Sequence, residues 1–181
     1  MLIPILITVA ALVVVVIIAV ALRPTDFRYT RSTTVNAPAA IVFDQVNNLR
    51  HWEAWSPWAK LDPTMKETYE GPPAGVGAKH HWVGNKKVGE GRMTITQSKP
   101  NELVVILLQF IKPFAATNTT EFVFAPQAGQ TLVTWSMFGK NNFMAKAFGM
   151  FVNIEKMIGK DFDKGLAAMK QVAESKAPAS I

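Results

Sequence analysis

Residues 142–173 read NFMAKAFGMFVNIEKMIGKDFDKGLAAMKQVA, and this segment sets the architecture of the chain. Its apolar side chains recur at steps of three or four, whereas its lysine, glutamate and aspartate side chains fall largely between them. That period is typical of an amphipathic α-helix with one apolar and one polar face. The pattern therefore predicts a single helix of about 30 residues, roughly 45 Å long, which needs a large apolar surface to pack against.

The chain before this helix predicts a series of β-strands. Residues 103–110 are almost continuously apolar, and the other candidate strands are short runs bounded by Gly, Pro or Asn. Such boundaries are what close connections between antiparallel neighbours require. The predicted strands are residues 25–35, 66–69, 78–83, 88–97, 103–110, 117–124 and 131–138, and two short helices, residues 39–46 and 49–55, follow the first strand.

The order of these elements indicates an α+β fold. Strands that run consecutively, with helices kept apart from them, are typical of an antiparallel sheet rather than of a doubly wound parallel one. The sheet must cover its apolar face, and the long C-terminal helix is the only predicted element large enough to do so. A curved sheet wrapped around one helix is expected to leave a cavity between the two.

Residues 1–22, MLIPILITVAALVVVVIIAVAL, contain no charged side chain. A bilayer core takes about 20 apolar residues as a helix, so the segment has the length of one transmembrane span. The alternative is a cleaved signal peptide, because Ala19-Val20-Ala21 resembles a small-residue cleavage site. We favour an uncleaved anchor, because no Lys or Arg precedes the apolar run and the run is longer than a signal peptide usually carries.

The charges that follow the span predict its orientation. Arg23, Arg28 and Arg31 come after it, so the positive-inside rule predicts a single-pass membrane protein whose remaining chain lies in the cytoplasm. The predicted organisation is a transmembrane anchor at residues 1–22, one domain at residues 23–175 and a polar tail at residues 176–181.

The composition excludes several functional classes. The chain has no cysteine, so it carries no disulfide scaffold, thiolate metal site or cysteine nucleophile, and it has three histidines in all. The sequence also lacks a phosphate-binding glycine loop, a dinucleotide fingerprint, a nucleophile elbow and a His-Glu-x-x-His motif. We therefore expect no metal and no cofactor.

The net charge of +6 is dispersed along the chain, with no basic run longer than Lys86-Lys87. Nucleic-acid binders usually concentrate their basic residues on one face or in one tract, so no nucleic-acid partner is expected. A dispersed basic surface suits a weak attraction to anionic lipid headgroups. The membrane is the expected partner beside a small molecule.

Several short motifs carry a family resemblance. They are Trp55-Ser56-Pro57-Trp58, Gly75-Val76-Gly77-Ala78, Trp82 with Gly84-Asn85 and residues 88–96, Thr134-Trp135-Ser136-Met137, and residues 157–162. Together with the element order, they resemble the polyketide cyclase/dehydrase-like branch of the START-like (SRPBCC) superfamily over about residues 26–174. The resemblance implies a helix-grip fold, in which a curved antiparallel sheet wraps round the long C-terminal helix.

The resemblance also implies a hydrophobic or lipid-like small molecule bound between the sheet and the long helix. Some members of the superfamily cyclise or dehydrate polyketides, and others only carry or sense ligands. Three hypotheses remain open: a membrane-anchored binding protein, an enzyme of the cyclase or dehydratase type acting on an aromatic or polyketide-like substrate, and an interaction module whose interior is filled. A fold does not by itself choose among them.

His80 is the best candidate for a catalytic group. Neighbouring residues in a strand point to opposite faces, so His80 and Trp82 share the inner face while His81 points to solvent. A neutral imidazole near its pKa can act as a general acid or base towards a bound carbonyl compound. A hydrogen-bonded histidine at the edge of a pocket explains the same pattern.

Parity along the strands and periodicity along the helix predict the cavity lining. Trp82, Met93, Trp135 and Phe148 are expected to face a common interior, and the same aromatic and aliphatic side chains would equally describe a filled core. The candidate ligand-binding residues are Trp55, His80, Trp82, Met93, Ile95, Phe110, Phe122, Phe124, Trp135, Met137, Phe148 and Phe151.

Overall fold

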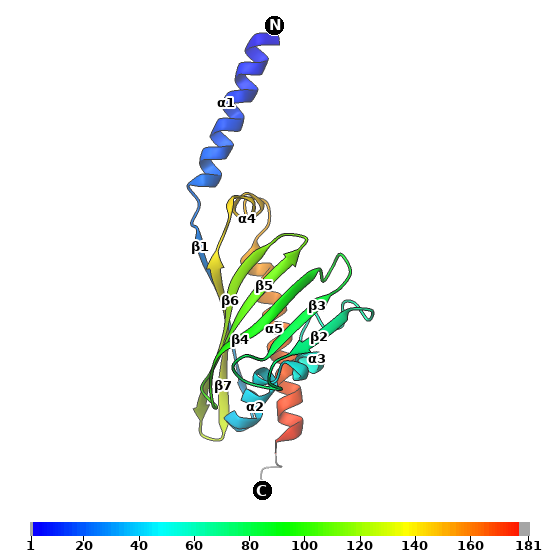
Figure 1. Ribbon diagram of the computed structural model, residues 1–181. Coiled ribbons are helices and arrows are strands. Elements are labelled where there is room, and N and C mark those ends of the chain that lie inside the picture. Colours follow the sequence, from blue (N-terminus) through cyan, green and yellow to red (C-terminus); the bar gives the residue numbers. More distant parts are fainter. Residues whose placement is uncertain (1, 178–181) are drawn as a thin grey trace.

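A single antiparallel sheet forms the body of the protein in the computed structural model, which describes residues 2–177. Its strands are β1 (Asp26–Val35), β2 (Lys66–Glu70), β3 (Lys79–Val83), β4 (Glu90–Lys99), β5 (Leu103–Lys112), β6 (Ala116–Gln127) and β7 (Gln130–Lys140). They lie in the order β1-β7-β6-β5-β4-β3-β2, so that every strand from β2 to β7 pairs with its neighbour in sequence and β1 closes against β7 (Figure 1).

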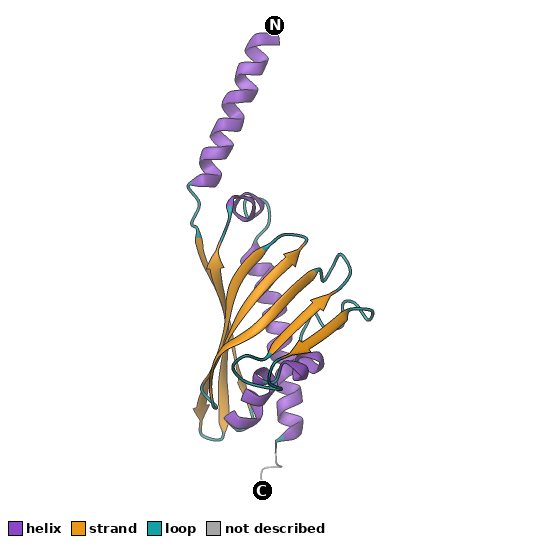
Figure 2. Ribbon diagram, viewed as in Figure 1, coloured by secondary structure: helices purple, strands orange, loops and turns teal. Residues whose placement is uncertain are grey.

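The helices gather on one side of this sheet, apart from α4, which lies at its end, and α1, which projects beyond that end (Figure 2). Their bounds are α1 (Leu2–Ala21), α2 (Ala39–Asn47), η1 (Leu49–His51), α3 (Trp52–Trp55), α4 (Phe143–Phe148) and α5 (Ile154–Lys176). The α+β helix-grip architecture predicted from the sequence is confirmed, with α5 as the helix that the curved sheet grips.

The apolar stripe of α5 faces the sheet and the short helices. Phe162, Leu166, Met169 and Ala173 are buried and follow one another at steps of four, three and four residues. Gly165 lies in the same stripe, directly against the indole ring of Trp135 on β7. The absence of a side chain there lets the helix approach the sheet closely.

The single helix of about 30 residues predicted for 142–173 is wrong. Residues 149–153 separate α4 from α5, and α5 has 23 residues, about 35 Å at 1.5 Å per residue. Each helix has its own asparagine cap: the side-chain oxygen of Asn142 accepts a hydrogen bond from the Ala145 amide, and that of Asn153 accepts one from the Lys156 amide. Asn153 therefore starts a new helix within residues 142–173, a segment whose apolar spacing shows no interruption.

This break corrects the expectation for two phenylalanines. Phe148 is 54% exposed and Phe151 is 87% exposed, so neither faces the interior between the sheet and the long helix. Phe148 belongs to the short helix α4 at one end of the domain, and Phe151 lies in the connection to α5. Their positions were predicted by continuing the stripe of α5 upstream through a segment that is not helical.

α1 is long and apolar enough to cross a membrane, a property that it shares with signal sequences. It extends away from the sheet, and Val20 is its only buried residue (Figure 1). At the other end of the chain, α5 continues to Lys176, and residues 178–181 of the predicted tail lie outside the described residues.

Candidate functional site

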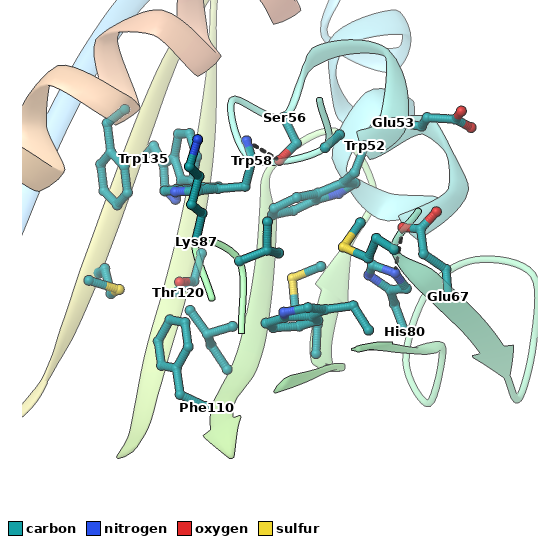
Figure 3. A pocket seen from close by; sticks show the side chains of 18 of the residues that line it. Trp52, Glu53, Ser56, Trp58, Glu67, His80, Lys87, Phe110, Thr120 and Trp135 are labelled. Atoms are coloured by element: carbon teal, nitrogen blue, oxygen red, sulfur yellow. Dashed lines mark hydrogen bonds and ion pairs between the residues drawn. The ribbon is translucent and has the colours of Figure 1, made fainter. Parts of the chain in front are cut away.

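A cavity of about 260 Å³ lies between the inner face of the sheet and α5. Most of its walls are aromatic or aliphatic, and Figure 3 shows ten of its residues labelled. The lining residues are Trp52, Glu53, Ser56, Trp58, Ala59, Met65, Glu67, Tyr69, His80, Trp82, Lys87, Val88, Met93, Leu108, Phe110, Thr120, Trp135, Met137, Ile158 and Phe162. The expected cavity is therefore present.

Strand alternation places the side chains of β3 at this cavity. His80 and Trp82 are buried, whereas Lys79 and Val83 are exposed. Trp82 lies opposite Gly91 of β4, and a Cβ atom at position 91 would overlap the indole ring. Gly91 thus leaves free the space that the Trp82 ring occupies.

His80 is held by two residues of the neighbouring strand β2. Its Nε2 atom lies 2.9 Å from Oε1 of Glu67, and its ring stacks on that of Tyr69 at 4.7 Å between centroids (Figure 3 for the His80–Glu67 pair). The Tyr69 hydroxyl donates to the same Glu67 oxygen at 3.4 Å. Three titratable side chains therefore converge on one wall of the cavity.

The electrostatics of this group favour a neutral imidazole. Burial lowers the pKa of His80 below its ordinary 6.5, and the nearby Glu67 carboxylate opposes that shift. Burial, with a smaller contribution from Glu67, raises the pKa of Tyr69 to about 12, so the phenol keeps its proton. A neutral His80 that donates its Nε2 proton to Glu67 carries a lone pair on Nδ1, which makes Nδ1 a hydrogen-bond acceptor.

Two buried nitrogens at the cavity lack a hydrogen-bond partner among residues 2–177: Nδ1 of His80 and Nε1 of Trp135. The Trp135 ring stacks on Phe162 of α5 at 4.0 Å and on Phe122 of β6 at 4.8 Å. Its indole N–H can only donate. Buried polar groups are normally paired, and both nitrogens belong to residues that line the cavity, although neither nitrogen is itself exposed to it. A small shift of these side chains would let a bound ligand supply the missing acceptor and donor.

The structure divides the candidate ligand-binding residues into three groups. Those that line the cavity are His80, Trp82, Met93, Phe110, Trp135 and Met137. Those that are buried in the core without lining it are Trp55, Ile95, Phe122 and Phe124. Phe148 and Phe151 are exposed elsewhere. Contact of any of these residues with a ligand stays a prediction.

Sequence reasoning missed the polar partners of His80. Glu67 faces Trp82 across the β2–β3 pair, diagonal to His80, and Tyr69 faces His80 directly. The only signal for these partners is the pairing of β2 with β3, and the register of that pairing depends on the loop between the two short strands. Without that register, no carboxylate in the sequence could be assigned to His80.

The family of the chain follows from the comparison with known proteins. Residues 26–174 match the family described as polyketide cyclase / dehydrase and lipid transport. The chain belongs to this family. No curated protein matches the sequence.

Solved structures share the fold of this polyketide cyclase/dehydrase family member at low identity. The Zhui aromatase/cyclase from Streptomyces sp. R1128 has a TM-score of 0.61 and 14% identity, over 85% of this chain and 97% of that one. Protein SA2116 from Staphylococcus aureus, of unknown function, gives 0.62 and 10% over 83% and 94%. Protein CV1439 from Chromobacterium violaceum gives 0.58 and 14% over 84% and 99%.

These identities support the fold and carry no residue-level assignment. Membership of the polyketide cyclase/dehydrase family, the START-like fold and the apolar cavity together support a ligand-binding domain. The resemblance expected from the sequence motifs is confirmed.

Proposed function

We propose that the protein is a membrane-anchored domain that binds a compact hydrophobic or lipid-like molecule in the cavity between the sheet and α5. The observation that supports this most is that two residues of a mainly apolar cavity lining, His80 and Trp135, each carry a buried nitrogen without a hydrogen-bond partner, Nδ1 and Nε1. The ligand that fits has an apolar body, a carbonyl-type acceptor for Trp135 and a hydroxyl-type donor for His80.

The volume limits the size of the ligand. The cavity volume of about 260 Å³ lies just below the range of typical ligand pockets, which begins at about 300 Å³. A compact ring system or the end of a longer lipid fits this space. Met65, Met93 and Met137 in the walls suit guests of varied shape, because methionine side chains adapt easily.

The anchor is the second part of the proposal. α1 at residues 2–21 crosses the bilayer once, and residues 23–175 form the domain on its cytoplasmic side. Arg23, Arg28 and Arg31 support that orientation, because basic residues after a span favour the cytoplasmic side.

The test is a titration of the full chain in lipid nanodiscs with a naphthyl methyl ketone, followed through the indole N–H signals of the five tryptophans in NMR spectra. We expect the Trp135 signal, assigned by its loss in Trp135→Phe, to move downfield as the ketone accepts its hydrogen bond. An alkylnaphthalene of equal size, which lacks an acceptor, is the matched probe and leaves that signal in place. If the ketone moves no indole signal more than the hydrocarbon does, the proposed ligand chemistry is wrong.

The replacement at position 135 is Phe rather than Ala for a physical reason. Trp135 is 2% exposed and stacks on Phe162, so its truncation to Ala is expected to cost about 3–5 kcal/mol of stability whether or not it binds a ligand. Phe keeps an aromatic ring in the stack and removes the N–H donor. The variant thereby separates ligand binding from folding.

A second candidate function is an enzyme of the cyclase or dehydratase type. It is favoured by the convergence of His80, Glu67 and Tyr69 on one cavity wall. With Nε2–H held by Glu67, Nδ1 of His80 is the nitrogen available to take a proton from a carbon or hydroxyl of a bound carbonyl compound.

His80→Gln separates the two candidates. An enzyme would lose turnover of a poly-ketone substrate in this variant, and a carrier would keep its affinity for the naphthyl ketone within about fivefold, since one neutral hydrogen bond contributes about 1 kcal/mol. Undiminished turnover in His80→Gln would exclude His80 as the catalytic base.

A further inference from the structure

Five large apolar side chains stand uncovered at the end of the domain next to α1. In and after α4, the exposed fraction is 48% for Phe143, 66% for Met144, 54% for Phe148 and 87% for Phe151. In the turn between β5 and β6, Phe114 is 76% exposed. We call these five residues the apical face. Apolar clusters of this kind mark a surface that meets a partner.

Strand register places both parts of the apical face at the same end of the sheet. Asp26 at the start of β1 lies opposite Lys140 at the end of β7, just before α4 in the chain. Phe110 near the end of β5 pairs with Ala116 at the start of β6, so the turn that carries Phe114 lies at this same end of the sheet. Figure 1 shows α4 and the β5–β6 turn at the end of the sheet from which α1 emerges.

α4 also touches the end of α1. The Nζ atom of Lys146 on α4 lies 3.5 Å from the carbonyl oxygen of Ala21, the last residue of α1. Phe151 lines a hollow of about 540 Å³ together with Arg23 and Pro24, which lie two and three residues after the end of α1. The apical face therefore starts within one side-chain length of the point where α1 ends.

The length of α1 fixes where that point lies in a bilayer. Its 20 residues span about 30 Å as a helix, which equals the thickness of the hydrocarbon core. When α1 spans the bilayer, Ala21 lies at the boundary of the hydrocarbon, and the headgroup layer beyond it is only about 5–8 Å thick. A helix in contact with Ala21 lies within that layer.

We infer that the apical face inserts into the lipid leaflet from which α1 emerges, so that the domain contacts the bilayer directly and is not attached to it through α1 alone. This inference rests on the proposed membrane anchor. The partner is a phospholipid surface: phenylalanine and methionine enter the boundary between headgroups and acyl chains, and the exposed Lys140 beside α4 reaches anionic headgroups.

The placement bears on how a ligand reaches the cavity. Lys87 and Val88 of the β3–β4 turn line the cavity and lie at the same end of the sheet as the apical face, because Glu90 of β4 is opposite Lys112 of β5. Ile158, on the second turn of α5, lies on the helix wall of the cavity one turn from Ile154. A molecule that leaves the bilayer at the apical face thus meets the cavity without crossing the sheet.

The test uses the absence of cysteine from the chain. An environment-sensitive fluorophore is attached to two single-cysteine variants, Phe148→Cys and Val76→Cys. Phe148 is 54% exposed on the apical face, and Val76 is 59% exposed in the turn between β2 and β3, at the other end of the sheet. The full chain is reconstituted in phosphatidylcholine–phosphatidylglycerol vesicles that contain a lipid with a nitroxide high on the acyl chain. Phe151→Cys serves as a second apical position.

We expect nitroxide quenching at positions 148 and 151 to exceed that at position 76 by at least about twofold, because an interfacial face sits about 5–10 Å deep. If the chain resists carbonate extraction but all three labels are quenched equally, the membrane anchor is supported and the insertion of the apical face is refuted. A blue-shifted but unquenched label at 148 means that protein, such as a second copy, covers the face, which also overturns the inference. Release of the chain by carbonate refutes the anchor and the inference together.

Discussion

His80 and Glu67 form a hydrogen-bonded pair in the cavity wall, and their coupling leads to a specific prediction. The Glu67 carboxylate, 2.9 Å from Nε2, raises the pKa of His80 against the lowering effect of burial. Glu67→Gln removes the charge and keeps the shape, so the His80 pKa is expected to fall further below 6.5. Imidazole NMR signals followed through a pH titration of the full chain measure this directly. A His80 pKa that rises in Glu67→Gln would contradict the assigned pairing.

The same pair gives a pH dependence of stability. Because the folded-state pKa of His80 lies below 6.5, the unfolded chain takes up the proton first as the pH falls. The contribution of His80 to stability is therefore complete above about pH 6.5 and is lost as the pH falls from there towards the folded-state pKa. Thermal unfolding between pH 7.5 and pH 5 is expected to show a smaller loss of stability in His80→Gln than in the wild type, and an equal loss would count against a buried neutral imidazole.

At the scale of the elements, residues 103–110 and 131–138 show what the sequence could predict. Each is a strand within a few residues of its expected bounds, because apolar patterning and turn residues act locally. His80 and Trp82 point inward for the same local reason, namely strand parity. The cavity wall formed by these strands was accessible to sequence reasoning.

Two features could not be predicted from the sequence: the break before α5 and the position of Glu67 beside His80. The first depends on competition between local signals, and the second depends on strand register. The break at residues 149–153 arises because the Asn153 side chain caps a new helix. The spacing of apolar residues does not show where such a cap lies. The position of Glu67 beside His80 depends on how β2 pairs with β3. Periodicity fixes which face a side chain occupies, whereas register fixes its neighbours.

The contact between α5 and the sheet yields a prediction for one glycine. A Cβ atom at Gly165 would lie 2.8 Å from Cζ3 of Trp135 and 3.1 Å from Cδ of Pro57. Gly165→Ala gains about 1 kcal/mol of helix propensity, but it forces the helix away from a packed ring. We expect a net loss of about 1–3 kcal/mol in unfolding free energy, measured by chemical denaturation.

Gly159, one and a half turns earlier in α5, is the matched control. The atoms nearest to its missing Cβ belong to the guanidinium of Arg31, which can move, and whose ion pairs with Glu155 and Asp163 are partly exposed and long, at 3.7 Å each. Gly159→Ala is expected to be neutral or to stabilise by up to about 1 kcal/mol. If both substitutions destabilise equally, close packing of α5 on Trp135 does not explain the result.

At the scale of the whole molecule, we expect the sheet domain to fold without α1. β1 pairs with β7 along its whole length and begins at Asp26, after α1 has ended. Deletion of residues 1–22 is expected to release a folded chain into the supernatant after alkaline carbonate treatment, while the full chain stays in the membrane pellet. Near-ultraviolet circular dichroism of the five tryptophans checks the fold of the released chain.

Two outcomes would contradict this organisation. A truncated chain that stays in the carbonate-washed pellet without aggregating would show that residues 1–22 are not the sole anchor. A mature protein that begins near Leu22 would show that the segment is a signal peptide and that the domain is exported.

Native mass spectrometry of the detergent-extracted full chain tests the central claim, a small molecule held in the cavity, most directly. It is applied to the wild type, to Leu108→Trp, which adds an indole to the cavity wall, and to Leu61→Trp, which adds one at a site 45% exposed and outside the lining. We predict a discrete co-purified mass on the wild type and on Leu61→Trp, and its loss from Leu108→Trp. The same mass retained by Leu108→Trp, or a bare chain in all three, would contradict the account.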